Sequence, residues 1–192
     1  MMGTKPNAIS SVLDAKSWRE IDFEKAKRNV QKLQKRIVQA TKKGNWRQVK
    51  NLQRLLVHSR SAKIVAIQRV SSSRGSKTPG VDGRIWKSNA DKGKALRTLL
   101  HRKYKAQALR RVYIPKRGGG RRKLGIPTMK DRAMQALYLL SLDPISECTA
   151  DGFSYGFRRI RSCWDAREHL HQFLCRKKSA QWILDADIEK ML

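Results

Sequence analysis

The chain has 192 residues, of which 44 are Lys or Arg and 15 are Asp or Glu, so its formal net charge is +29. Its length allows one domain or two small ones, and it contains no uninterrupted apolar run of the roughly 20 residues that cross a membrane. The cysteines, Cys148, Cys163 and Cys175, are odd in number and fit no C-x-x-C metal motif, so we expect free thiols in a reducing compartment.

The positive charge is concentrated in two segments. Residues 25–81 contain 16 basic and no acidic residues, and residues 92–130 contain 14 basic and none acidic. Such a field destabilises a compact chain unless a polyanion neutralises it, and nucleic acid is the favoured polyanion because bound phosphates release their counterions. A basic surface that is only solvated is the alternative, and no membrane partner is expected. The N-terminus shows no apolar leader, so we predict a cytoplasmic protein.

The first 70 residues are predicted to form a basic helical extension. Apolar residues recur every three or four positions from Phe23 to Ala40, and Gly44 then ends this helix. A second helix is expected from Trp46 to about Val70, so that the two form a hairpin. A coiled-coil-like brace is the plain interpretation, but a brace would gain from opposite charges four residues apart. The missing acids favour a phosphate-facing surface, and the candidate residues for binding a nucleic acid such as RNA are Arg36, Lys43, Arg47, Lys50 and Arg54.

Residues 71–90 are predicted to be a loop that begins with the sequence SSSRGSKTPGVDG. The Pro79–Gly80 pair suits a type II turn, in which glycine takes the positive φ. Arg74 and Lys77 are candidate RNA contacts on this loop. A plain linker explains the composition equally well.

A basic hairpin follows a helix that we expect over residues 91–104. Strands are predicted at 109–116 and 121–126, joined by the sequence KRGGGRRK at 116–123. A glycine-rich turn lets backbone amides and cations close over phosphates. Lys116, Arg122 and Lys123 are therefore candidate nucleotide-binding residues. Many RNA-binding loops have a similar run, and a merely solvated hairpin tip is the other alternative.

Two further helices and a strand complete the expected order. Thr128 is predicted to cap a helix that runs toward Pro144, and Ser162 to cap another whose Trp164, Leu170 and Leu174 point partly inward. Between them lies the sequence SYGFR at 154–158, with its phenylalanine expected inward and its arginine outward. An apolar strand is expected from Trp182.

Three blocks in this order resemble the group II intron reverse transcriptases. They are TPGVDG at 78–83, the basic hairpin with the LGIPT that follows it, and SYGFR at 154–158. The resemblance extends from about Trp18 to Ile188. It implies an α+β fold in which a basic helical N-terminal extension precedes the fingers, at 91–180, and the incomplete palm of a right-hand polymerase, with a first palm strand at 181–192.

The resemblance also implies residue roles. Lys116 and Arg122 would contact the incoming nucleotide, while Arg158 and Arg161 would lie along RNA. Asp187 matches the catalytic aspartate that binds Mg²⁺. The chain departs from the family pattern at 159–162, where RIRS replaces PGRS, and at the aromatic position expected near Leu192.

The function implied is that of an N-terminal part of a reverse transcriptase/maturase. It would bind intron or template RNA and, in the complete protein, take part in RNA-directed DNA synthesis and assist splicing. One matched carboxylate cannot hold two Mg²⁺ ions, so we expect no polymerase activity from the chain alone. Two alternatives stay open: a stand-alone RNA-binding or RNA-chaperone protein, and a polymerase completed by a second polypeptide.

Overall fold

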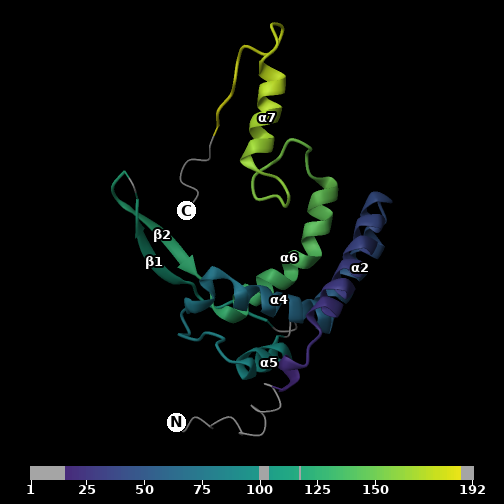
Figure 1. Cartoon of the computed structure of the whole chain (residues 1–192), viewed down its shortest axis with the longest axis vertical. Coiled ribbons are helices and arrows are strands. Elements are labelled where there is room, and N and C mark those ends of the chain that lie inside the picture. Colours follow the sequence, from purple (N-terminus) through teal and green to yellow (C-terminus); the bar gives the residue numbers. More distant parts are fainter. Residues whose placement is uncertain (1–15, 100–103, 117, 187–192) are drawn as a thin grey trace. The chain divides into compact units, whose positions relative to one another are not determined.

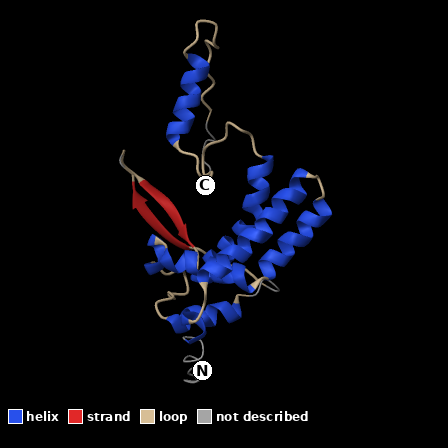
Figure 2. Ribbon diagram, turned by 45° about the vertical axis from the view of Figure 1, so that its right-hand side comes forward, coloured by secondary structure: helices blue, strands red, loops and turns tan. Residues whose placement is uncertain are grey.

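A computed structural model describes residues 16–99, 104–116 and 118–186 (Figure 1). It divides into two compact units, residues 1–148 and 149–192, which are considered separately. The described residues form an α+β fold in which helices predominate and two strands form a sheet (Figure 2). Within the described ranges, none of the helices is both long enough and apolar enough to span a bilayer.

The first helices begin where the sequence predicts. Helix α2 (Phe23–Lys42) starts after Asp22, whose carboxylate accepts a hydrogen bond from the Lys25 amide, and α3 (Trp46–His58) starts after Asn45 in the same manner. Gly44 joins them with a φ of 66°. The apolar stripe of α2 is buried as expected, with Ile37 fully inaccessible to solvent.

The prediction of one continuous helix from Trp46 to Val70 is wrong, because the helix is interrupted at Ser59. This residue is extended (φ −66°, ψ 137°), and its hydroxyl accepts from the amide of Ala62, the third residue of α4 (Arg60–Ser72). A serine side chain competes with the helical backbone in this way and favours a cap. Helix α4 contacts α2, α3 and α5, so the extension forms a helical group with a shared core instead of a hairpin.

Helix α5 (Asn89–Thr98) is shorter than the predicted 91–104. Ser88 and Asp91 form a reciprocal capping box that sets its start. At its other end, Tyr104 is not helical and hydrogen-bonds to Asp131 instead. The intervening residues 100–103 lie outside the described part.

The predicted hairpin is confirmed. Strands β1 (Arg110–Pro115) and β2 (Arg121–Ile126) pair antiparallel. The turn between them needs a left-handed backbone at Gly119 (φ 86°) and Gly120 (φ 80°), which glycine adopts without steric cost.

Helix α6 (Met129–Thr149) runs through Pro144, and Figure 1 shows its ribbon changing direction along its length. Thr128 caps it as predicted, accepting from the Asp131 amide. Proline has no amide hydrogen, so the carbonyl of Leu140, four residues earlier, loses its helical donor. The side-chain amide of Gln34 on α2 replaces it, at 2.8 Å from the Leu140 oxygen. Pro144 thereby creates the acceptor that joins α6 to α2.

The second unit contains α7 (Cys163–Leu174), capped by Ser162 as predicted. The expected inward orientation of the α7 side chains is wrong, because Trp164 and Leu170 are exposed. No residue of α7 is buried, since its unit offers little for the helix to pack against. Residues 182–186 form no strand, since a strand requires a hydrogen-bonded neighbour and the described residues supply none here. Trp182 is 92% exposed.

We predict that Gln34→Ala destabilises the first unit by about 1–2 kcal/mol, because it leaves the Leu140 carbonyl without a donor. Urea unfolding followed by circular dichroism measures this change. The exposed Gln31→Ala on the same helix is the matched control and should be nearly neutral. In a Pro144→Ala background, residue 144 regains its amide, so Gln34→Ala should become nearly neutral too. An equal cost in both backgrounds would contradict the account.

Candidate nucleic-acid interface

The predicted cations of the helical extension lie on its surface. Arg36, Lys43, Arg47, Lys50 and Arg54 are all exposed. The last three are spaced by three and four residues along α3, so they share one side of that helix, away from its buried Val49, Leu52 and Leu56. We call Arg47, Lys50 and Arg54 the α3 cation row. Since residues 25–81 contain no acid, no nearby residue in the sequence competes with phosphate for these cations.

The predicted loop begins later than expected, because α4 continues to Ser72, and the remaining residues 73–83 are anchored and do not form a plain linker. The guanidinium of Arg132 donates to the carbonyl oxygens of Gly75 and Thr78, each at 2.7 Å, and to that of Pro127 at 3.0 Å. Gly80 lies so close to α6 that a Cβ there would be 2.6 Å from the Thr128 Cα. The predicted type II turn is wrong, because the φ of Gly80 is not positive; this close approach is what requires glycine here. Both predicted phosphate contacts, Arg74 and Lys77, are exposed on a short 3-10 helix (η1, Arg74–Lys77).

Asp131 forms a buried network at the start of α6. It is 4% exposed and accepts hydrogen bonds from the hydroxyls of Tyr104 and Thr128 and from the Gln107 amide. Burial acts to raise the pKa of Asp131, but these hydrogen bonds outweigh it, so the pKa lies below its usual value. Burial, followed by the contact with Asp131, raises the pKa of Tyr104 to about 12. The network fixes the segment before β1 to α6.

From the sequence, Asp131 and Arg132 were not identified as residues that organise the structure. Asp131 and Arg132 appear in the sequence as ordinary members of a basic motif. The available signal was that Asp131 is the first acid after a 39-residue acid-free segment, 92–130. A lone carboxylate in such a field is expected to have a specific partner.

The hairpin register divides the predicted nucleotide-binding residues between two faces. Arg122 pairs with Ile114, and Lys123 pairs with Tyr113. Side chains alternate along a strand, so Arg122 shares a face with Ile114 and, by continued alternation, with Lys116. Lys123 lies on the opposite face. Lys116 and Arg122 therefore share a face near the turn, and Lys123 does not.

In the second unit the structure differs from the expected orientation of SYGFR. Phe157 is fully exposed in a left-handed backbone (φ 59°), whereas Arg158 is half-buried, the reverse of the expectation. Arg161 donates to the carbonyl oxygens of Gly152 and Ser154 at 2.8 and 2.6 Å, and its guanidinium lies 5.9 Å from the Tyr155 ring centroid. Arg161 thus holds this loop together, and its RNA contact stays a prediction.

The predicted metal ligand, Asp187, lies outside the described residues. Over the described ranges 16–99, 104–116 and 118–186, no group of three or more His, Cys, Asp or Glu side chains is placed to hold a metal ion. Asp185 is exposed. The described residues do not by themselves fit a Mg²⁺ ion.

Comparisons with known proteins match both parts of the chain. A family model described as the N-terminal domain of reverse transcriptase matches residues 18–99, and one described as reverse transcriptase (RNA-dependent DNA polymerase) matches residues 114–191.

Three curated relatives accompany these matches. Protein YkfC of Escherichia coli is 38% identical over 124 residues, which are 61% of this chain and 32% of that protein. Group II intron-encoded protein LtrA of Lactococcus lactis subsp. cremoris is 32% identical over 128 residues (65% and 21%). The putative COX1/OXI3 intron 1 protein of Saccharomyces cerevisiae is 28% identical over 136 residues (66% and 15%). The matched region spans less than a third of each relative.

We predict that Asp131→Asn lowers the free energy of unfolding by about 2–3 kcal/mol at neutral pH, because a charged acceptor is lost. The folded pKa of Asp131 lies below its unfolded value of 3.8, so the carboxylate's contribution is present above that value and is lost as the pH falls through the folded pKa. Urea midpoints of wild type and variant should therefore converge in acid. The exposed Asp151→Asn removes the same charge as a control. A constant difference down to about pH 2 would contradict the assignment.

Proposed function

Because this chain belongs to the family of group II intron-encoded reverse transcriptases and maturases, we propose that it binds RNA along α2 and α3. In the whole protein this surface would hold intron or template RNA during RNA-directed DNA synthesis and would assist splicing. The observation that carries the proposal is the exposed cationic face of these helices, formed by a segment without a single acid between residues 25 and 81.

The physical argument rests on counterion release. A nucleic acid that places phosphates against the α3 cation row and against Arg36 and Lys43 releases condensed ions, which favours binding entropically. The anchored loop adds Arg74 and Lys77, both exposed. Its position is set by Arg132, so these cations are presented without the entropy loss of ordering a free linker.

The hairpin is proposed to contact the triphosphate of an incoming nucleotide through Lys116 and Arg122. The support is their shared face beside a glycine turn, where the Gly119 amide donates to the Lys116 carbonyl and the Lys116 amide to that of Gly120. Asp187 is proposed to bind Mg²⁺ together with carboxylates from the rest of the polymerase. When bound, that ion would neutralise charge on the transferred phosphoryl group.

We expect that reversing four cations, Arg36, Lys43, Arg47 and Lys50, to glutamate raises the dissociation constant for single-stranded RNA at least tenfold. Each lost phosphate contact should also reduce the slope of log K against log salt by about 0.7, hence by roughly three for four contacts. Fluorescence anisotropy over a salt titration measures both quantities.

The matched control makes the same change of charge outside the acid-free segments, at Arg167, Arg176, Lys177 and Lys178, all exposed. It should keep most of the affinity and of the salt slope. If the two quadruple variants lose affinity equally, the effect is one of net charge, and the proposed face is wrong. A slope near zero for the wild type would remove the electrostatic account altogether.

We further predict that Lys116→Ala with Arg122→Ala abolishes the weak binding of a nucleoside triphosphate, while Lys123→Ala changes it less than about twofold, since its side chain lies on the other face. Competition with a fluorescent triphosphate analogue measures these affinities. RNA binding by α2 and α3 should persist in the double variant. Should RNA and triphosphate affinity fall together, the hairpin belongs to the RNA-binding surface and is not a triphosphate site.

A further inference from the structure

We propose that the hollow between α3 and α6 holds one unstacked base of the bound RNA strand, with the neighbouring phosphates on Lys50 and Arg54. This inference rests on the proposed RNA binding and deepens it. It adds a position at which the protein binds a base of the RNA. Elsewhere on the cationic face, only the phosphates of the RNA backbone are bound.

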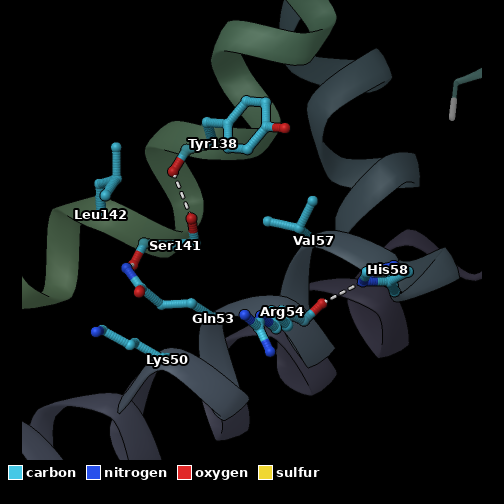
Figure 3. A pocket seen from close by; sticks show the side chains of 8 residues that line it. All are labelled: Lys50, Gln53, Arg54, Val57, His58, Tyr138, Ser141 and Leu142. Carbon is cyan, nitrogen blue, oxygen red and sulfur yellow. Dashed lines mark hydrogen bonds between the residues drawn. The ribbon is translucent and has the colours of Figure 1, made fainter. Parts of the chain in front are cut away.

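The hollow has a volume of about 420 Å³, within the range of ligand-sized sites. Figure 3 shows Tyr138 and Leu142 of α6 on one side and Gln53 and Val57 of α3 on the other. Lys50 and Arg54, four residues apart, line it from α3. Both helices belong to the first compact unit, so the hollow is defined within one body.

The side chains of Gln53 and Ser141 within the hollow already have partners. The side-chain amide of Gln53 donates to the Ser141 carbonyl at 3.2 Å, and the Ser141 hydroxyl donates to the Tyr138 carbonyl at 2.8 Å. The first of these bonds joins α3 to α6, and the second lies within α6. The surface left for a ligand is chiefly the Tyr138 ring with Leu142 and Val57, of which Tyr138 is 40% and Leu142 54% exposed. Such a surface suits a flat apolar group and does not suit a highly polar metabolite.

The charges then identify the occupant. Lys50 and Arg54 are exposed, and none of the residues that line the hollow is acidic. An apolar protein helix would fill the space but gain nothing from two cations. A nucleotide satisfies both features, since its base stacks on an aromatic side chain and its phosphates meet the cations. The hollow also continues the α3 cation row, so a strand following that row reaches it directly.

The test compares two single-stranded oligomers of equal length and charge, an oligoribonucleotide and its abasic counterpart, by fluorescence anisotropy with the full chain. Wild type should prefer the oligomer with bases, and Tyr138→Leu should reduce this preference about tenfold, the expected share of one stacked base. Tyr138→Phe keeps the ring and should keep the preference. Lys50→Gln should weaken both oligomers alike, because it removes a phosphate contact.

The matched control is Leu139→Ala, which removes an exposed apolar side chain next to Tyr138 that does not line the hollow. It should leave the preference intact, and thermal melts should show that each variant is folded. If Tyr138→Leu keeps the preference, or weakens both oligomers equally, the base site is wrong and RNA binding stands. If neither oligomer binds wild type with a salt-dependent affinity, the proposed function itself has failed.

Discussion

One helical turn at the start of α6 holds together two segments that the sequence keeps apart. Asp131 accepts hydrogen bonds from Tyr104 and Gln107, while the adjacent Arg132 donates to carbonyls of the 73–83 loop and to Pro127. The hairpin and the loop therefore have a common attachment. In a chain of net charge +29, a buried carboxylate with saturated hydrogen bonds acts as a fixed point around which cationic segments are arranged.

The cations divide into two groups by what they contact. Arg132 and Arg161 bond to backbone carbonyls and organise loops, as the planar guanidinium allows. Those of the α3 cation row are exposed on a helix whose other side is core. Repulsion within that row is offset by apolar burial in the helical group, where Ile37, Leu56 and Ile67 are fully inaccessible. The core thus supports a surface charge that by itself opposes folding.

Local signals in the sequence predicted most element starts, because caps and glycine turns act through neighbouring residues. Asn45, Thr128 and Ser162 are examples, and the paired strands of the hairpin are another. The break at Ser59 was missed since apolar periodicity continues across it. The roles of Arg132 and Gln34 could not be predicted, as each depends on a carbonyl more than 50 residues away. The face assignment of Lys123 needed the strand register, which composition does not give.

That register has a consequence for how this hairpin tolerates change. Because side chains alternate with a period of two, deleting Arg121, which lies in β2 between the turn and Arg122, would exchange the two faces beyond it. Lys123 would then occupy the position beside Lys116, so the cation count of that face would be conserved while the guanidinium was replaced by an ammonium. Such a change would leave the charge of that face unaltered. It would alter the geometry of phosphate binding, since an ammonium lacks the two-pronged fit to phosphate.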